Sequence, residues 1–427
     1  MGKSGGKGIS YFGLVAMGIG CMLGTSWLLL TGTWLETAGG PLNLVVAFAL
    51  CIIIELPFAF AYMEAIPMLP LPGGEVVYSY AAFGSRGGFA VGWAGILMNT
   101  IVFCWVDLAA VSLLDELFPA LGRTAVLYEL GDFPVTLPNV AIQLALAGAI
   151  LWVQLRGANV CASLAKLATV VLLIMCAVGL AVCFTHFDPA VYASDGGLDF
   201  DFAGSASLLS LLVFSVAGCM PWREAVGRTA PFADVLVSIT GVPAVRVLFL
   251  ATAFVGAVGV MNSTLYSSAQ MLYGLSRFAL VSRAFSALHP KYGTPARCIW
   301  FTAAFVVLTP FTGRLFFLPF INIASLATIV MWIMSLAAVL RLRRARPDLR
   351  RPVRMPGGRV TAVLGVAASV FLAGNILLPF SPGALDGLEY ALAAALAALG
   401  VLLYGFRDRT LSDEAREALI FGGPERR

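Results

Sequence analysis

Long apolar runs, separated by short polar connections, follow one another along the whole chain. A membrane-spanning helix needs about 20 consecutive, mostly apolar residues, and by this measure the pattern predicts about eleven spans. No connection between them is long enough for a soluble domain, so residues 1–427 are predicted to form a single polytopic, all-α integral membrane domain. The predicted spans are residues 9–34, 41–66, 87–114, 137–155, 159–185, 205–222, 244–275, 297–313, 316–341, 360–381 and 386–406.

The composition agrees with this pattern. Hydrophobic residues make up 60% of the chain and charged residues 12%, and the mean hydropathy is +0.91. A soluble domain carries about 25% charged residues. The net charge of +4 is too small to indicate a nucleic-acid partner. The eight cysteines show no CxxC or zinc spacing, and they are expected to be small buried apolar residues.

Sequence motifs of enzymes and ATP-driven pumps are not found. The chain has no P-loop, no HExxH and no GxSxG, and it contains only two histidines. We therefore expect no catalytic residues, no cofactor and no metal. The first apolar run is too long for a cleavable signal peptide, so it is expected to stay in the membrane.

The positions of lysine and arginine predict the orientation, because these residues are enriched in cytoplasmic loops. Lys3 and Lys7 precede the first span, and Arg86 and Arg156 follow even-numbered spans. The loops after the third and fifth spans are acidic instead. We therefore expect a multi-pass protein of the cytoplasmic membrane whose N-terminus lies in the cytoplasm.

The same charges indicate that one helix is missing. Arginine-rich stretches around 277–297 and 341–359 flank the spans at 297–313 and 316–341, and both stretches should be cytoplasmic. Segments 205–222 and 244–275 would then cross the membrane in the same direction. Residues 223–243 between them carry charges and two prolines and cannot form a span.

The first span contains an unusual stretch, Gly18-Ile19-Gly20-Cys21-Met22-Leu23-Gly24-Thr25-Ser26. Glycine and hydroxyl residues weaken a helix. Unwound backbone at bilayer depth is tolerated where it lines a cavity, and secondary transporters use it to bind anionic groups. The alternative is that small residues merely allow close helix packing.

Several motifs, in order along the chain, resemble the amino acid–polyamine–organocation (APC) superfamily of permeases. They are Leu23-Gly24-Thr25-Ser26, Pro72-Gly73-Gly74-Glu75, Phe214-Ser215-Val216-Ala217-Gly218, His289-Pro290-Lys291-Tyr292-Gly293 and Asn322-Ile323-Ala324-Ser325-Leu326. The resemblance implies a LeuT-like inverted five-helix repeat with discontinuous helices 1 and 6. It also implies that Pro231-Phe232-Ala233-Asp234 should follow helix 7, so the missing span would be helix 7 and the repeat incomplete.

The resemblance further implies a substrate site between the two broken helices. Backbone N–H groups of helix 1 would bind the carboxylate of an amino acid, and carbonyl groups of both helices would face its ammonium group. Phe214 would close over the substrate. The residues implied for this site are Met22, Gly24, Thr25, Ser26, Phe214, Ala217 and Gly218.

Four ionisable residues inside spans are candidates for gating or proton coupling. Asp107 and Glu55 could carry a proton, and Asp107 could instead bind a cationic side chain, or both could be neutral hydrogen-bonded acids. Glu64 could act at an inner gate or as an interfacial cap. Lys166 could replace a sodium ion, as in some relatives, or could extend to the cytoplasmic interface.

Together these features predict a secondary active transporter or exchanger of amino acids or related amines that works by alternating access. The expected partners are a small amino acid substrate, membrane lipid at the arginines of residues 341–359, and a coupling proton. The alternative is a membrane protein that binds a ligand without transporting it, as a sensor or a partner subunit.

Overall fold

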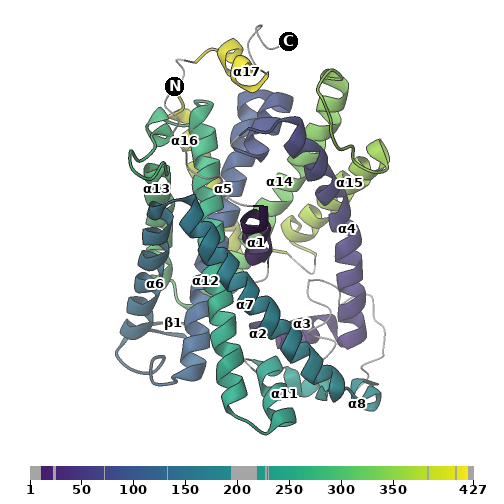
Figure 1. Cartoon of the computed structure of the whole chain (residues 1–427), viewed down its shortest axis with the longest axis vertical. Coiled ribbons are helices and arrows are strands. Elements are labelled where there is room, and N and C mark those ends of the chain that lie inside the picture. The colour runs from purple at the N-terminus through teal and green to yellow at the C-terminus, as the bar shows by residue number, and fades with distance from the viewer. Residues whose placement is uncertain are drawn as a thin grey trace. The chain divides into compact units, whose positions relative to one another are not determined.

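Long helices make up most of the computed structural model, which describes residues 11–22, 26–71, 73–131, 133–193, 219–226, 228, 230–381, 384–408 and 411–421 (Figure 1). In this described part, eight helices are long and apolar enough to cross a membrane. The first half contains α1 (Tyr11–Met22), α2 (Ser26–Leu29), α3 (Thr31–Ala38), α4 (Pro41–Met68), α5 (Glu75–Leu117), β1 (Val126–Leu130), β2 (Phe133–Thr136), α6 (Leu137–Arg156), α7 (Ala158–Thr185) and α8 (Pro189–Ala193). The second half contains α10 (Trp222–Ala225), α11 (Pro231–Thr240), α12 (Ala244–Arg277), α13 (Ala296–Val306), α14 (Phe317–Ala345), α15 (Gly358–Leu377), α16 (Gly387–Gly405), α17 (Asp413–Phe421) and the short 3-10 helices Arg283–Ser286, Thr309–Phe311 and Arg314–Phe316.

Most predicted spans correspond to one helix each, because an apolar run that crosses a bilayer must satisfy its own backbone groups. The helices α4, α6, α7, α12, α14, α15 and α16 begin and end within a few residues of the predicted limits. The span predicted at 297–313 is different. Its helix, α13, ends at Val306, before Pro310, which has no N–H group for a continuing helix.

In the described part of the connection that was predicted to be too polar for a span, the helices are short. Within residues 219–226, 228 and 230–243, the structure has the one-turn helix α10 and the ten-residue helix α11. The predicted span at 205–222 falls mostly on residues 194–218, which lie outside the described part of the chain.

Two local features depart from the sequence prediction. The helix α5 is longer than the predicted span 87–114, and it bends at Gly84, where φ is 71° and ψ is −162°. These angles favour glycine over residues with a Cβ atom. An antiparallel β-hairpin of β1 and β2, which was not predicted, connects α5 to α6, while the described structure is otherwise helical, as the all-α prediction expects.

The chain divides into two compact units, and the boundaries between them fall inside α4, α5 and α12 and at both ends of residues 309–314. The first unit comprises residues 1–53, 106–263 and 309–314. In it α7 packs along α1, as Figure 1 shows. Gly179 of α7 faces the rings of Phe232 and Phe249, and a Cβ atom at Gly179 would lie 2.8 Å from each. The short helix α11 is thereby packed into the core of this unit.

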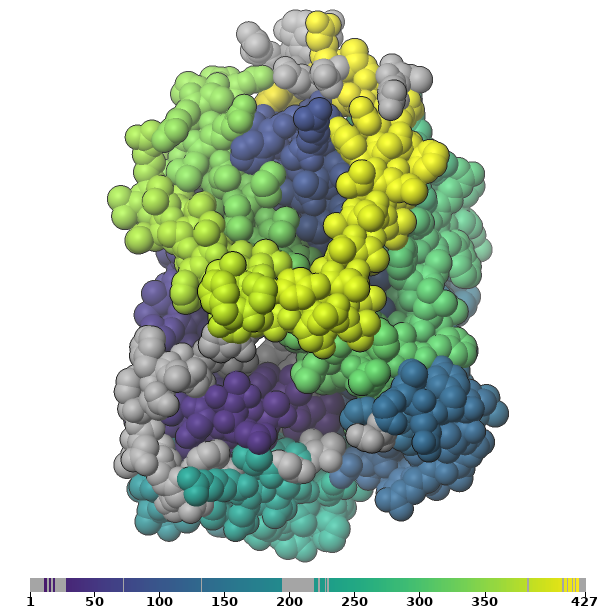
Figure 2. Space-filling model, turned by 180° about the vertical axis from the view of Figure 1, so that it is seen from behind, coloured from purple at the N-terminus to yellow at the C-terminus, as the bar shows by residue number. Residues whose placement is uncertain are grey.

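The second unit comprises residues 54–105, 264–308 and 315–427, and α14 packs along α15 in it. The ring of Phe58 in α4 stacks on Trp332 of α14, with 4.3 Å between ring centroids. An apolar groove of about 530 Å³ is lined by α5, α14 and α16. Figure 2 shows this side of the unit, with α16 in yellow next to α5 in blue.

Candidate transport site and the Glu64 network

The backbone around the proposed break in helix 1 is described on both sides. The helix α1 ends at Met22 and α2 begins at Ser26, while Gly24 and Thr25 between them lie outside the described residues. A bend at Leu30 then separates α2 from α3. The other centre implied by the family resemblance, Phe214, Ala217 and Gly218, also lies outside the described residues.

The segments that follow these two centres are in close contact within the first unit. Gly32 of α3 lies so near α10 that an added Cβ atom would be 2.6 Å from the carbonyl oxygen of Ala225. Ala225 and Ala230 are fully buried. Glycine allows this approach because no side chain separates the two backbones. The continuation of helix 1 is therefore packed on the continuation of the segment predicted as helix 6.

A threonine of α7 makes a direct hydrogen bond to the backbone of α1. The Thr169 hydroxyl donates to the carbonyl oxygen of Ala16 at 2.9 Å, and Thr169 is buried. This contact is hard to predict from the sequence, because a threonine inside a helix usually bonds to a carbonyl of its own preceding turn. The bond fixes α7 to α1 one to two turns before the predicted break.

Asp107 lies in α5 and belongs to the first unit. Its side chain has no solvent exposure, and neither carboxyl oxygen has a hydrogen-bond partner among the described residues. Its neighbours Val106 and Leu108 are buried as well. A charged carboxylate in such surroundings is costly unless it is paired. Among the described residues, no hydrogen bond or ion pair to Asp107 offsets such a charge.

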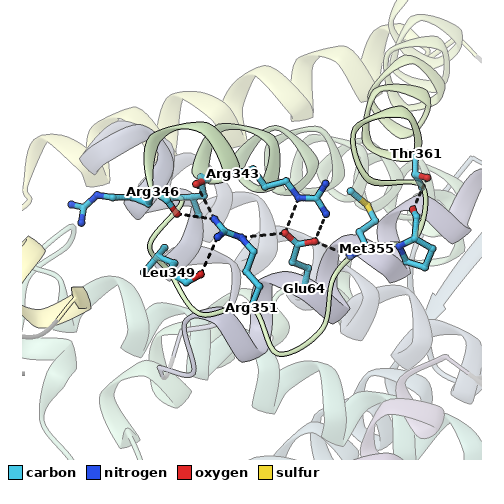
Figure 3. A network of polar contacts seen from close by, with 9 residues as sticks. Glu64, Arg343, Arg346, Leu349, Arg351, Met355 and Thr361 are labelled. Carbon is cyan, nitrogen blue, oxygen red and sulfur yellow. Dashed lines mark hydrogen bonds and ion pairs between the residues drawn. The ribbon is translucent and has the colours of Figure 1, made fainter. Parts of the chain in front are cut away.

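Glu64 is at the centre of a polar network in the second unit (Figure 3). Its side chain is fully buried at the end of α4. The Arg343 guanidinium donates to both carboxylate oxygens, one of these bonds being 2.8 Å long through Nε, and the backbone N–H of Met355 donates at 2.8 Å. Bidentate pairs of this kind are among the strongest hydrogen bonds in proteins.

A second arginine connects this network to the end of α14. Arg351 Nε lies 3.5 Å from Glu64 Oε1, and its other nitrogens donate to backbone carbonyl groups. These acceptors are the carbonyl oxygens of Leu342, Arg346, Pro347 and Leu349. The last carbonyls of a helix have no partner within it, so Arg351 acts as a side-chain cap of α14.

The remaining ionisable candidates lie in more open positions. Glu55 is partly exposed on α4, and no hydrogen bond or ion pair joins it to another described residue. Lys166 is exposed on α7, with its Nζ 5.0 Å from the ring centroid of Phe12. Among the described residues, neither residue forms an ion pair with Asp107 or Glu64.

Buried amide groups connect three helices elsewhere in the first unit. The Gln154 amide donates to Asn262 Oδ1 at 3.0 Å and to its backbone carbonyl, and the Asn262 amide donates to the Cys161 carbonyl at 2.8 Å. Both amides are at most 2% exposed. This network joins α6, α7 and α12, and it explains why polar side chains occur within those apolar runs.

The fold and these buried polar groups define a polytopic α-helical membrane protein with the interior polar sites typical of transport proteins. A profile of the amino acid permease family matches residues 9–205 and 200–403, and the chain therefore belongs to this family within the APC superfamily. It is a multi-pass membrane transporter and not an enzyme.

Three similar proteins are known from Bacillus subtilis (strain 168). The methylthioribose transporter is 24% identical over 96% of this chain and 96% of its own length. The glutamate/serine transporter AimA is 26% identical over 84% of this chain and 76% of its own. The branched-chain amino acid permease BcaP is 26% identical over 88% of this chain and 89% of its own. The family resemblance predicted from the motifs is thus confirmed.

Proposed function

We propose that the chain is a secondary transporter of a small amino acid or related amine, with a LeuT-like arrangement and alternating access. The observation that carries this proposal is Asp107, a fully buried carboxyl group in α5 with both oxygens unpaired among the described residues. An ionisable group inside a membrane helix is a functional candidate because its burial costs free energy.

Asp107 suits a coupled carrier because it needs a positive partner to be ionised in this position. A proton can supply this partner, and so can the ammonium or cationic group of a substrate. A carrier that takes up one and then releases the other couples substrate movement to a proton. Glu64 is instead already paired with Arg343 and Arg351, so we propose that it holds the end of α14 at the inner gate.

The substrate would bind where α1 and α2 meet the segment 205–222. The backbone N–H groups of Thr25 and Ser26 would bind the carboxylate, and carbonyls of Met22, Phe214 and Ala217 would face the ammonium group. The close contact of Gly32 with Ala225 supports this pairing, because it packs the flanking segments together in the same unit.

The orientation and the lipid contact are part of the same proposal. Lys3 and Lys7 favour a cytoplasmic N-terminus, which puts the arginines of 341–359 on the cytoplasmic side. Arg344, Arg350 and Arg354 of this stretch are exposed and can meet anionic lipid headgroups.

Reconstituted protein tests the proposal. We expect liposomes to accumulate labelled serine, glutamate or leucine under an imposed pH gradient, and we expect Phe214→Ala to reduce this uptake. Arg350→Gln is the matched control, because Arg350 is exposed and far from the proposed site in sequence. Uptake that equals that of protein-free liposomes for every amino acid and amine tested would overturn the transport proposal.

A second candidate function follows from the short helices between residues 219 and 243. Because α10 and α11 occupy a connection where the family resemblance requires a span, the chain could bind its ligand without moving it. Thermal stabilisation by an amino acid without any liposome uptake would support this sensor or partner-subunit role.

A further inference from the structure

A polar cavity of about 410 Å³ lies within the first unit, and none of the described residues proposed for transport is part of its lining. It is bounded by the end of α5, the β-hairpin, the start of α6 and residues 310–314. Ser112, Val135, Thr136, Gln143 and Pro310 form buried parts of its wall. Exposed residues such as Phe133 and Arg314 complete the lining, so the cavity opens to the surface.

Three oxygen atoms of residues that line this cavity have no hydrogen-bond partner among the described residues. They are Asp115 Oδ1, Asn139 Oδ1 and Gln143 Oε1, and all three are buried. Gln143 as a whole is only 4% exposed. Buried polar atoms are nearly always paired in proteins, and each exception calls for an explanation.

These three oxygens belong to one local arrangement. Asn139 and Gln143 are one turn apart on α6 and share a face of that helix. The Asn139 amide donates to Asp115 Oδ2 at 3.0 Å, which joins α6 to α5. The remaining oxygens are all acceptors, so a ligand that satisfies them must bring donors or positive charge.

The cavity also contains positive charge. Arg123 and Arg314 line it, both are exposed, and no ion pair involves either of them in the described part of the chain. Arg314 is close enough for its charge to act on the Asp115 carboxylate. Glu116, which also lines the cavity, is already paired with Arg246. Acceptors and free guanidinium groups therefore occur in the same pocket.

The walls of the cavity are held in place by specific contacts. The Tyr128 hydroxyl of β1 donates to the Phe311 carbonyl at 2.6 Å. Gly313, with φ of 62°, leaves room for Val135 of β2, since a Cβ atom there would lie 2.9 Å from Val135 Cγ2. The hairpin and residues 310–314 thus form one preorganised surface.

We propose that this cavity is a second binding site, distinct from the transport site, for the α-ammonium and α-carboxylate groups of a free amino acid. The ammonium group supplies donors to the oxygens of Asp115, Asn139 and Gln143. The carboxylate pairs with Arg314, and the side chain of the ligand extends toward the opening. Under the predicted orientation the site faces the outside of the cell.

This proposal goes beyond the transport function and can be tested without flux. Phe133 lines the cavity and is 40% exposed, so Phe133→Cys gives a reporter whose reaction with the neutral reagent N-ethylmaleimide is followed by mass spectrometry. The protein without this substitution measures the background from its own cysteines. We expect glycine at twice its dissociation constant to slow the labelling of this cysteine about threefold.

Truncated probes separate the two halves of the site. Glycinamide lacks the carboxylate and acetate lacks the ammonium group, so each should protect more weakly than glycine. Combined with Phe133→Cys, Asp115→Asn or Gln143→Leu should raise the glycine concentration needed for protection roughly tenfold. Arg314→Gln should weaken protection by glycine but not protection by glycinamide. Arg350→Gln is the control for loss of an exposed arginine and should leave all probes unchanged.

Two results would overturn the proposal. If sodium chloride slows the labelling more than choline chloride does, and glycine has no further effect, the cavity is an inorganic cation site. Unchanged labelling with every probe, or protection that persists in Asp115→Asn, Gln143→Leu and Arg314→Gln alike, would mean that no amino acid binds there. Arg314 is exposed, so its variant should fold even if the buried ones do not. Liposome uptake is measured separately, so failure of this site and failure of transport are distinguishable.

Discussion

Glu64→Gln should destabilise the second unit because it removes the charge on which the network of Figure 3 depends. The Glu64 side chain is fully buried, while the side chains of Arg343 and Arg351 are 21% and 10% exposed. Removing one partner of a buried ion pair costs about 3–5 kcal/mol. The glutamine can still accept hydrogen bonds and the arginines retain some solvent, so we expect about 3 kcal/mol, the lower end of this range.

The assay is thermal unfolding of the purified full chain in detergent. For a cooperative unit of 150–250 residues, 1 kcal/mol corresponds to about 2–4 °C in the unfolding temperature, so the variant should melt about 6–12 °C lower. Arg344→Gln is the matched control, because Arg344 lies next to Arg343 on α14 but is exposed. Its unfolding temperature should stay within about 2 °C of the unmodified protein, as for most surface substitutions.

A double-mutant cycle then isolates the pair itself. If Glu64 and Arg343 interact as described, the double variant Glu64→Gln/Arg343→Gln should cost at least about 1 kcal/mol less than the sum of the two single variants. High salt should change these values little, because a buried pair is poorly screened. A Glu64→Gln variant that melts with the Arg344→Gln control, or a strictly additive cycle, would refute the reasoning.

Three further predictions concern other parts of the structure. Gly32→Ala should lower the free energy of unfolding by about 1–3 kcal/mol, because its Cβ atom would meet the α10 backbone. Gly18→Ala is the control and should be neutral or stabilising, because its Cβ atom would meet nothing within 4 Å. Equal unfolding temperatures of the two variants would contradict the described packing. Asn262→Ala should lower the free energy of unfolding by roughly 1–3 kcal/mol, because Gln154 loses one of its two buried acceptors and the Cys161 carbonyl loses its donor. An unchanged unfolding temperature would show that this network is dispensable. Asp107→Asn should flatten the dependence of liposome uptake on pH, and a profile identical to that of the unmodified protein would end its proposed role in proton coupling.

The helices were largely predictable because the length of an apolar run and the bilayer thickness fix where a span begins and ends. The exceptions depend on single residues. Pro310 ends the regular helix of the segment 297–313 early, and this effect is visible in the sequence. The bend at Gly84 is not, because glycine occurs 44 times and only the local backbone shows which one bends a helix.

The sequence draws attention to the residues of the Glu64 network, but it does not show their contacts. Glu64 and the arginines of 341–359 were both identified from the sequence, yet their pairing joins positions 279 residues apart and depends on how α4 meets α14. The hydrogen bond from Thr169 to Ala16 has the same character. The cavity next to Asp115 depends on a hairpin that apolar periodicity does not reveal, because its strands are short and mostly exposed.

That hairpin has a practical consequence. A sheet of only two strands has two free edges, and the residues of β1 from Val126 to Glu129 are exposed. An extended loop of an antibody fragment can pair with such an edge through backbone hydrogen bonds. The hairpin is therefore a suitable epitope for enlarging this small membrane protein for electron cryomicroscopy, and a fragment bound there would also show by competition whether the neighbouring cavity is occupied.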